Sequence, residues 1–113
     1  MCLRDVYKRQ LCTFNDDIQG TAAITVGTLL SAINVTGTPL NEQRVAVFGA
    51  GSAGTGICAL LWRAMVDAGL AEAEARGRFY LVDRDGLLVD SMTGLQPFQA
   101  PFAQKRAALS RCV

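Results

Sequence analysis

The run from Arg44 to Gly54, R-V-A-V-F-G-A-G-S-A-G, constrains the fold of this chain more than any other stretch. Its apolar, β-branched first half predicts a short strand, and helical sequence follows its last glycine. The spacing G-x-G-x-x-G between them is typical of a turn that binds the pyrophosphate of a dinucleotide, although a purely structural turn can have the same spacing. We therefore predict a βαβ unit with a nucleotide site at its first turn. The last six residues of this run are called the glycine loop below.

Five of the six positions of the glycine loop have a physical reason. Gly49 permits the tight turn, Gly51 lets the backbone approach the phosphates, and Gly54 allows the helix to pack closely on the strand. The backbone N–H groups near Ser52 and Ala53 lie at the start of the helix, where unpaired donors and the helix dipole favour an anion. These five residues are the predicted cofactor-binding residues of the loop.

The remaining elements follow from periodicity. Apolar residues at helical spacing predict a buried helix from Gln19 to about Val35, with a stop at Gly37, and a second helix after the glycine loop that Gly69 closes. The run 79–82 predicts a second strand. A short helical piece, a turn and a late short helix are expected at 71–75, 84–86 and 102–109. The fold class is α/β, a partial Rossmann-type doubly wound parallel sheet in which a long helix precedes the βαβ unit.

The 113 residues fit one small domain. Residues 1–10 contain three basic side chains and no clear periodicity, which favours a non-native or disordered N-terminal segment over an ordinary frayed terminus. We predict that residues 11–109 form a partial dinucleotide-binding domain and that residues 110–113 are a tail.

Composition excludes several function classes. A net charge of +1 provides no electrostatic footprint for nucleic acid or an anionic membrane surface. The chain has no histidine, so catalysis confined to it would depend on carboxylates. Its four cysteines show no C-x-x-C pairing and are interpreted as reduced thiols. The longest apolar stretch, 22–33, falls short of a bilayer span, and we expect a cytoplasmic protein.

Asp83 ends the second predicted strand, where dinucleotide-binding folds place the carboxylate that binds the ribose hydroxyls. It lies further after Gly54 than the roughly 20 residues that are usual, and a solvated turn aspartate is the alternative. The adjacent Arg84 could pair with a 2′-phosphate, which Asp83 would repel, or could simply be a surface residue. The sequence thus favours NAD and leaves NADP open.

A second constellation, F-N-D-D-I-Q-G-T at 14–21, places Asp16 and Asp17 just ahead of the first helix. Aspartates at this place can cap free N–H groups and suit the positive end of the helix dipole. They can also supply one oxygen ligand to Mg²⁺ or Mn²⁺ if the other ligands come from elsewhere. Two acids alone do not make a metal site, so the residues leave both interpretations open.

Taken together, C-T-F-N-D-D-I-Q-G-T-A at 12–22, the glycine loop and V-D-R-D-G-L-L at 82–88 resemble malic enzymes, with L-Q-P-F at 95–98 as a further match. The resemblance implies oxidation of L-malate with NAD(P)⁺ and decarboxylation to pyruvate and CO₂, with Mg²⁺ or Mn²⁺ as cofactor. It implies that Asp17 is a metal ligand and that Asp16 supports the general base through a hydrogen bond. The same likeness assigns the pyrophosphate to the glycine loop, the adenosine ribose to Asp83, and a homo-oligomeric parent to the chain.

Other parts of a malic enzyme site have no counterpart in this sequence. By resemblance, a Glu-Asp pair and then a tyrosine and a lysine lie upstream of N-D-D, where only Asp5 is acidic, and asparagines lie downstream. We therefore expect an internal fragment that supplies NAD binding and one metal carboxylate and is inactive alone. A stand-alone dinucleotide-binding module without catalysis is the alternative, and a chain that does not fold stably because of an exposed sheet edge is a third.

Overall fold

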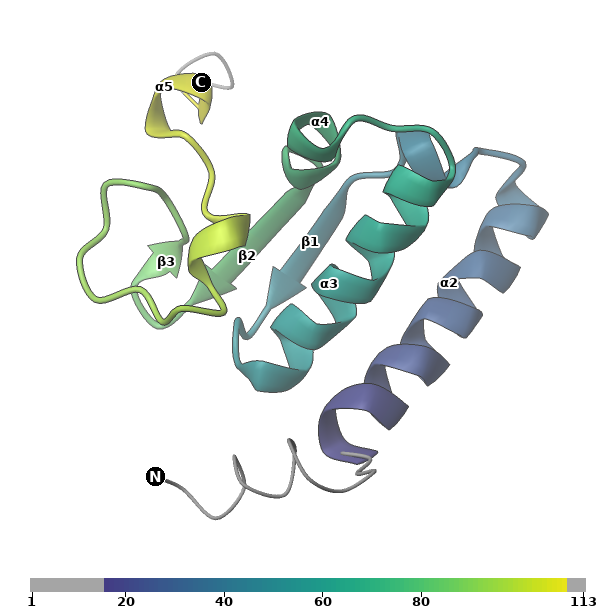
Figure 1. Ribbon diagram of the computed structural model, residues 1–113, viewed down its shortest axis with the longest axis horizontal. Coiled ribbons are helices and arrows are strands. Elements are labelled where there is room, and N and C mark those ends of the chain that lie inside the picture. The colour runs from purple at the N-terminus through teal and green to yellow at the C-terminus, as the bar shows by residue number, and fades with distance from the viewer. Residues whose placement is uncertain (1–15, 110–113) are drawn as a thin grey trace.

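The computed structural model describes residues 16–109, so the predicted N-terminal segment 1–10 and the tail 110–113 lie outside the described residues. A central helix lies against a small sheet, and a long helix runs beside the central one (Figure 1). In chain order the elements are η1 (Asp16–Gly20, a π-helix), α2 (Thr21–Thr36), η2 (Leu40–Glu42, 3₁₀), β1 (Val45–Phe48), α3 (Ser52–Asp67), α4 (Glu72–Arg76), β2 (Phe79–Asp83), β3 (Gly86–Leu87), η3 (Ala100–Phe102, 3₁₀) and α5 (Arg106–Leu109).

The sheet has the order β1-β2-β3. β1 and β2 are parallel, with Val45 opposite Phe79, and α3 is part of the connection between them, which confirms the predicted βαβ unit. β2 and β3 are antiparallel, with Val82 opposite Leu87, so the sheet is mixed rather than wholly parallel. β3 could not be predicted from the sequence, because a two-residue strand has no periodicity and only its pairing with β2 defines it.

The core lies between α3 and one face of the sheet. Cys58, Leu61 and Met65 are fully buried on α3, and they belong to one cluster with Phe79 and Leu81 of β2, which are also fully buried. Side chains alternate along a strand, so these two β2 residues share a face. Burial of each large apolar side chain contributes roughly 1.5–3 kcal/mol, so this cluster is the main source of stability.

The prediction that the first helix is buried is wrong. Within α2 only Ala22 and Val26 are buried, whereas Val35 is 88% exposed. The reason is that α2 packs on α3 through one side while its opposite side faces outward (Figure 1). The predicted stop is confirmed, since Gly37 adopts φ 74° and its N–H donates to the Ile33 carbonyl oxygen at 2.9 Å.

Together η1 and α2 form one helix of 21 residues, Asp16–Thr36. By length and composition this helix is long and apolar enough to cross a membrane. The prediction that the apolar stretch is too short for a bilayer span is therefore not confirmed. A single helix of this kind near the N-terminus is weak evidence for a membrane span, because core helices and signal sequences pass the same test.

Candidate functional site

The glycine loop leaves the sheet at the carboxyl end of β1. Gly49 has φ 105°, a left-handed conformation that side chains rarely adopt, and its N–H donates to the Val82 carbonyl oxygen at 2.8 Å. The turn therefore starts at a backbone hydrogen bond to β2, directly after the parallel pairing of β1 and β2. It ends where α3 begins at Ser52.

Two other glycines of the loop differ in what surrounds them. A Cβ at Gly54 would lie 2.3 Å from the Gly49 carbonyl oxygen and 3.3 Å from a methyl carbon of Val47, so close packing of α3 on β1 requires glycine there. A Cβ at Gly51, with φ −80°, would meet no described atom within 4 Å. Nothing in residues 16–109 thus demands glycine at position 51, and the space beside its backbone is open.

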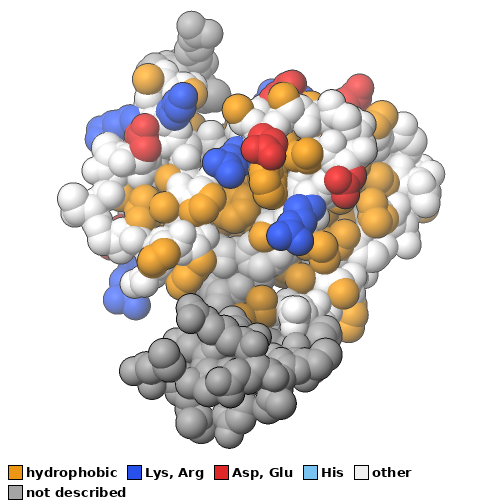
Figure 2. Space-filling model, in the orientation of Figure 1, with side chains coloured by type: hydrophobic (Ala, Val, Ile, Leu, Met, Phe, Trp, Pro, Cys, Tyr) orange, Lys and Arg blue, Asp and Glu red, His pale blue; other side chains and the backbone are white. Residues whose placement is uncertain are grey.

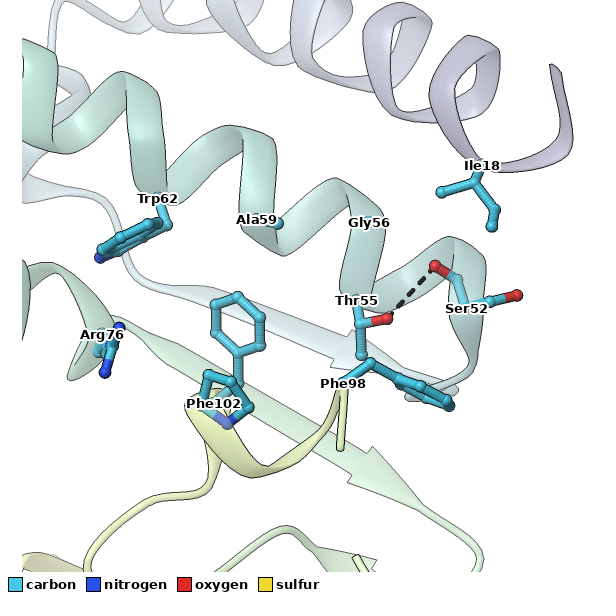
Figure 3. Close-up of a pocket in the computed structure, with 10 residues that line it drawn as sticks. Ile18, Ser52, Thr55, Gly56, Ala59, Trp62, Arg76, Phe98 and Phe102 are labelled. Atoms are coloured by element: carbon cyan, nitrogen blue, oxygen red, sulfur yellow. Dashed lines mark hydrogen bonds between the residues drawn. The ribbon is translucent and has the colours of Figure 1, made fainter. Parts of the chain in front are cut away.

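The first turn of α3 leaves backbone N–H groups that can bind an anion. Gly51 is the N-cap and has no side chain to pair with the first N–H groups of the helix. The nearby Thr55 hydroxyl donates within the same turn, to the carbonyl oxygens of Gly51 (2.8 Å) and Ser52 (3.2 Å; Figure 3). Those first N–H groups, including that of Ala53, lie at the positive end of a 16-residue helix, where an anion is favoured.

The structure brings Asp83 to the glycine loop through a residue that the sequence analysis missed. The side-chain amide nitrogen of Gln99 donates to Asp83 Oδ2 at 3.0 Å and to the Ala50 carbonyl oxygen at 2.9 Å. Gln99 is buried and lies in a loop segment, so neither periodicity nor a motif could have indicated it. The short helix α4 lies between α3 and β2 and accounts for the long spacing between Gly54 and Asp83.

Arg84 follows Asp83 in the turn after β2 and is exposed. Both residues line a cleft of about 250 Å³ that Asp85 and Gln99 also line. The described residues thus place one cation and two carboxylates around this cleft, and the geometry places Arg84 close to the predicted ribose site.

Asp16 and Asp17 lie in η1 and are exposed. The next residue, Ile18, packs on α3 so closely that its Cγ2 atom would lie 2.9 Å from a Cβ at Gly56. This contact places η1 against the first half of α3. Among residues 16–109 no group of three or more His, Cys, Asp or Glu side chains could hold a metal ion, so a complete metal site is not formed there.

An open apolar cleft of about 650 Å³ lies between α3 and the 98–102 segment. Ser52 and Ile18 lie at one end, and Arg76 lies over the Trp62 ring at the other, 5.1 Å from its centroid (Figure 3). Phe98, which is 44% exposed, contributes to its apolar lining. Figure 2 shows a band of apolar side chains across the same face of the molecule.

Cys58 has no role in this site. Burial raises the pKa of its thiol from 9.0 to about 11, so the side chain stays protonated and unreactive at neutral pH. It is a free, fully buried cysteine of the core. The predictions for Cys2, Cys12 and Cys112 lie outside the described residues.

Two parallel strands joined through a helix, with a glycine loop at the first turn, define a partial Rossmann-type α/β domain. Residues 18–112 match the family model described as the malic enzyme NAD-binding domain. The chain therefore belongs to the malic enzyme NAD-binding domain family.

Known relatives agree with this assignment. The NAD-dependent malic enzyme of Psychrobacter arcticus is 55% identical over 103 residues, which cover 91% of this chain and 18% of the relative. The corresponding enzyme of Pseudomonas aeruginosa is 56% identical over 109 residues, 96% of this chain and 19% of the relative. The crystal structure of an NAD-dependent malic enzyme from Thermotoga maritima superimposes with a TM-score of 0.68 at 27% identity, covering 88% of this chain and 26% of that one. The chain thus spans about a fifth of the length of these curated relatives.

Proposed function

We propose that this chain binds the ADP-ribose half of NAD⁺ and forms the start of the nucleotide domain of an NAD-dependent malic enzyme. The observation that carries the proposal is the hydrogen-bonded link between the glycine loop and Asp83. In this arrangement the pyrophosphate binds the N–H groups at the start of α3, and the Asp83 carboxylate accepts hydrogen bonds from the ribose hydroxyls. A carboxylate in this place favours NAD⁺ over NADP⁺, because it repels a 2′-phosphate.

We further propose that the complete enzyme oxidises and decarboxylates L-malate in the cytoplasm as a homo-oligomer. A bound Mg²⁺ or Mn²⁺ supplies Lewis-acid stabilisation of negative charge in such a reaction. Asp17 would provide one oxygen ligand, and Asp16 would hydrogen-bond the general base. Support comes from the likeness of the N-D-D motif to malic enzymes and from the packing of η1 on α3. The other metal ligands are not among residues 16–109.

Isothermal titration calorimetry with NAD⁺ and ADP-ribose tests the binding proposal. We expect saturable binding of both ligands, and a Kd at least tenfold higher in Asp83→Ala, because a hydrogen bond to a charged group contributes about 1.5–3 kcal/mol. Asp67→Ala, an exposed aspartate at the end of α3, is the matched control and should leave the Kd unchanged. Absence of binding heat from a folded chain would refute the proposal.

The same preparation tests the expected lack of turnover. With L-malate, NAD⁺ and Mn²⁺, we expect no increase in absorbance at the NADH band. By the likeness to malic enzymes, the tyrosine and lysine of the site lie upstream of the N-D-D motif and have no counterpart in this sequence, and residues 16–109 form no complete metal site. Clear formation of NADH by this chain would contradict that expectation.

A further inference from the structure

The acid pair Asp16–Asp17 lies close to the proposed pyrophosphate site. Ile18, the next residue, packs on α3 at Gly56, where a Cβ would lie 2.9 Å from the Ile18 Cγ2 atom. Gly56 follows Ser52 after one helical turn, which is about 6 Å along the axis. Ile18 and Ser52 also lie at the same end of the apolar cleft (Figure 3). The two carboxylates are therefore on the order of 10 Å from the first N–H groups of α3.

Neither carboxylate of the pair is neutralised by the described part of the chain. Both are exposed, and the one ion pair within residues 16–109 joins Arg78 to Glu74. Arg63 lines a smaller cleft together with Ile18, but it forms no ion pair with either aspartate. Negative charge near a helix N-terminus is attracted by the same partial positive charge that binds an anion. The acid pair and a bound pyrophosphate therefore compete for the positive end of α3 and repel each other.

We propose that the acid pair opposes the binding of anionic nucleotides at the glycine loop, so that its charge sets the affinity for the pyrophosphate. This inference rests on the proposed function, because it concerns the same phosphate site. Gly56 is the positioning residue of the arrangement, since the absence of a side chain there lets Ile18 pack on α3 and keeps the pair near the loop. Ile18 is β-branched, so its Cγ2 atom has few alternative positions and the contact is well defined.

Coulomb's law gives the size of this repulsion. Both aspartates are exposed, so the effective dielectric constant is close to that of water, about 40–80. At about 10 Å, one carboxylate acting on one phosphate charge then raises the Kd about two- to fourfold, and the pair raises it about four- to sixteenfold. This separation is about one Debye length at 0.1 M salt, whereas the Debye length at 1 M salt is about 3 Å. The repulsion should therefore disappear at high salt.

Calorimetry of the whole chain with ADP-ribose and with adenosine tests the proposal. Asp16→Asn combined with Asp17→Asn keeps the shape of both side chains and removes their charge. At about 0.1 M salt we expect this double variant to lower the Kd for ADP-ribose about four- to sixteenfold and to leave the Kd for uncharged adenosine unchanged. Asp67→Asn, the same charge change at the far end of α3, is the matched control and should change neither Kd. At about 1 M salt the double variant and the parent chain should bind ADP-ribose equally.

Ile18→Ala tests the positioning role, because it removes the methyl group that packs at Gly56. In this background the gain from the two asparagines should become smaller, and a gain of the same size would overturn the positioning role. An ADP-ribose Kd that is unchanged in the folded asparagine variant, or an equal change with adenosine or in Asp67→Asn, would overturn the inference, while binding by the parent chain upheld the proposed function. Absence of ADP-ribose binding by the parent chain and by every variant would overturn both.

Discussion

Substitution of Gly54 by alanine tests whether the glycine loop depends on close packing of helix on strand. A Cβ at this position would lie 2.3 Å from the Gly49 carbonyl oxygen, which is a backbone atom and cannot move aside as a flexible side chain can. Over-packing of this kind costs about 1–3 kcal/mol, and the backbone contact favours the upper end. Alanine also gains about 1 kcal/mol of helix propensity over glycine.

The net loss expected for Gly54→Ala is therefore about 2 kcal/mol in the free energy of unfolding, or roughly 10 °C in Tm for a chain of this size. Gly27→Ala is the matched control, because Gly27 lies inside α2 and a Cβ there would meet no described atom within 4 Å. It should gain about 1 kcal/mol from helix propensity. Thermal unfolding followed by far-UV circular dichroism measures both variants. A Tm that rises in Gly54→Ala as in Gly27→Ala would refute the packing argument.

Three further predictions concern the core and the cleft. Leu61→Ala, at a fully buried site, should lower the free energy of unfolding in urea by about 2–5 kcal/mol. Leu60 is 38% exposed, so Leu60→Ala should lower it by less than about 1 kcal/mol. Equal losses would contradict the assigned core. Burial raises the pKa of Cys58 from 9.0 to about 11, so the thiol loses its proton at a lower pH in the unfolded state than in the folded state. The free energy of unfolding should therefore fall as the pH rises from 9 to 11, and below pH 9 it should not depend on this group. If Cys58→Ala shows the same fall with pH, Cys58 is not its cause. Arg76→Ala should lower the free energy of unfolding by about 0.5–1 kcal/mol, because it removes the cation over the Trp62 ring. It should also shift the fluorescence emission of Trp62, the one tryptophan of the chain, to longer wavelength. An unchanged emission spectrum would show that the cation does not cover the ring.

Much of the fold could be predicted because its signals are local. The strand before the glycine loop, the helix after it and the stop at Gly37 depend on side-chain periodicity and on backbone freedom within a few residues. The site was partly predictable for the same reason. The glycine loop and Asp83 each follow a strand, and the carboxyl ends of parallel strands lie at the same edge of a sheet.

Errors arose where distant segments decide the outcome. Periodicity indicated an apolar side on α2, but only the arrangement of helices determines that Ala22 and Val26 alone are buried in α2 and that its opposite side faces outward. The antiparallel strand β3 is defined by its pairing with β2, and the sequence of a two-residue segment does not predict such a pairing. For Asp16 and Asp17, the residues alone favour a helix start, and the likeness to malic enzymes favours Asp17 as a metal ligand. That metal role stays a prediction, because residues 16–109 contain no group of three or more possible ligands.

The sequence by itself determined the order of the elements and the chemistry of the nucleotide loop, because a left-handed turn and a crowded helix start require glycine at Gly49 and Gly54. Only the tertiary structure decided how the parts of the site are joined. Gln99 is separated from Ala50 by 49 positions and from Asp83 by 16, and it binds both. Such contacts depend on where folding brings a side chain, which its immediate neighbours in the sequence do not encode.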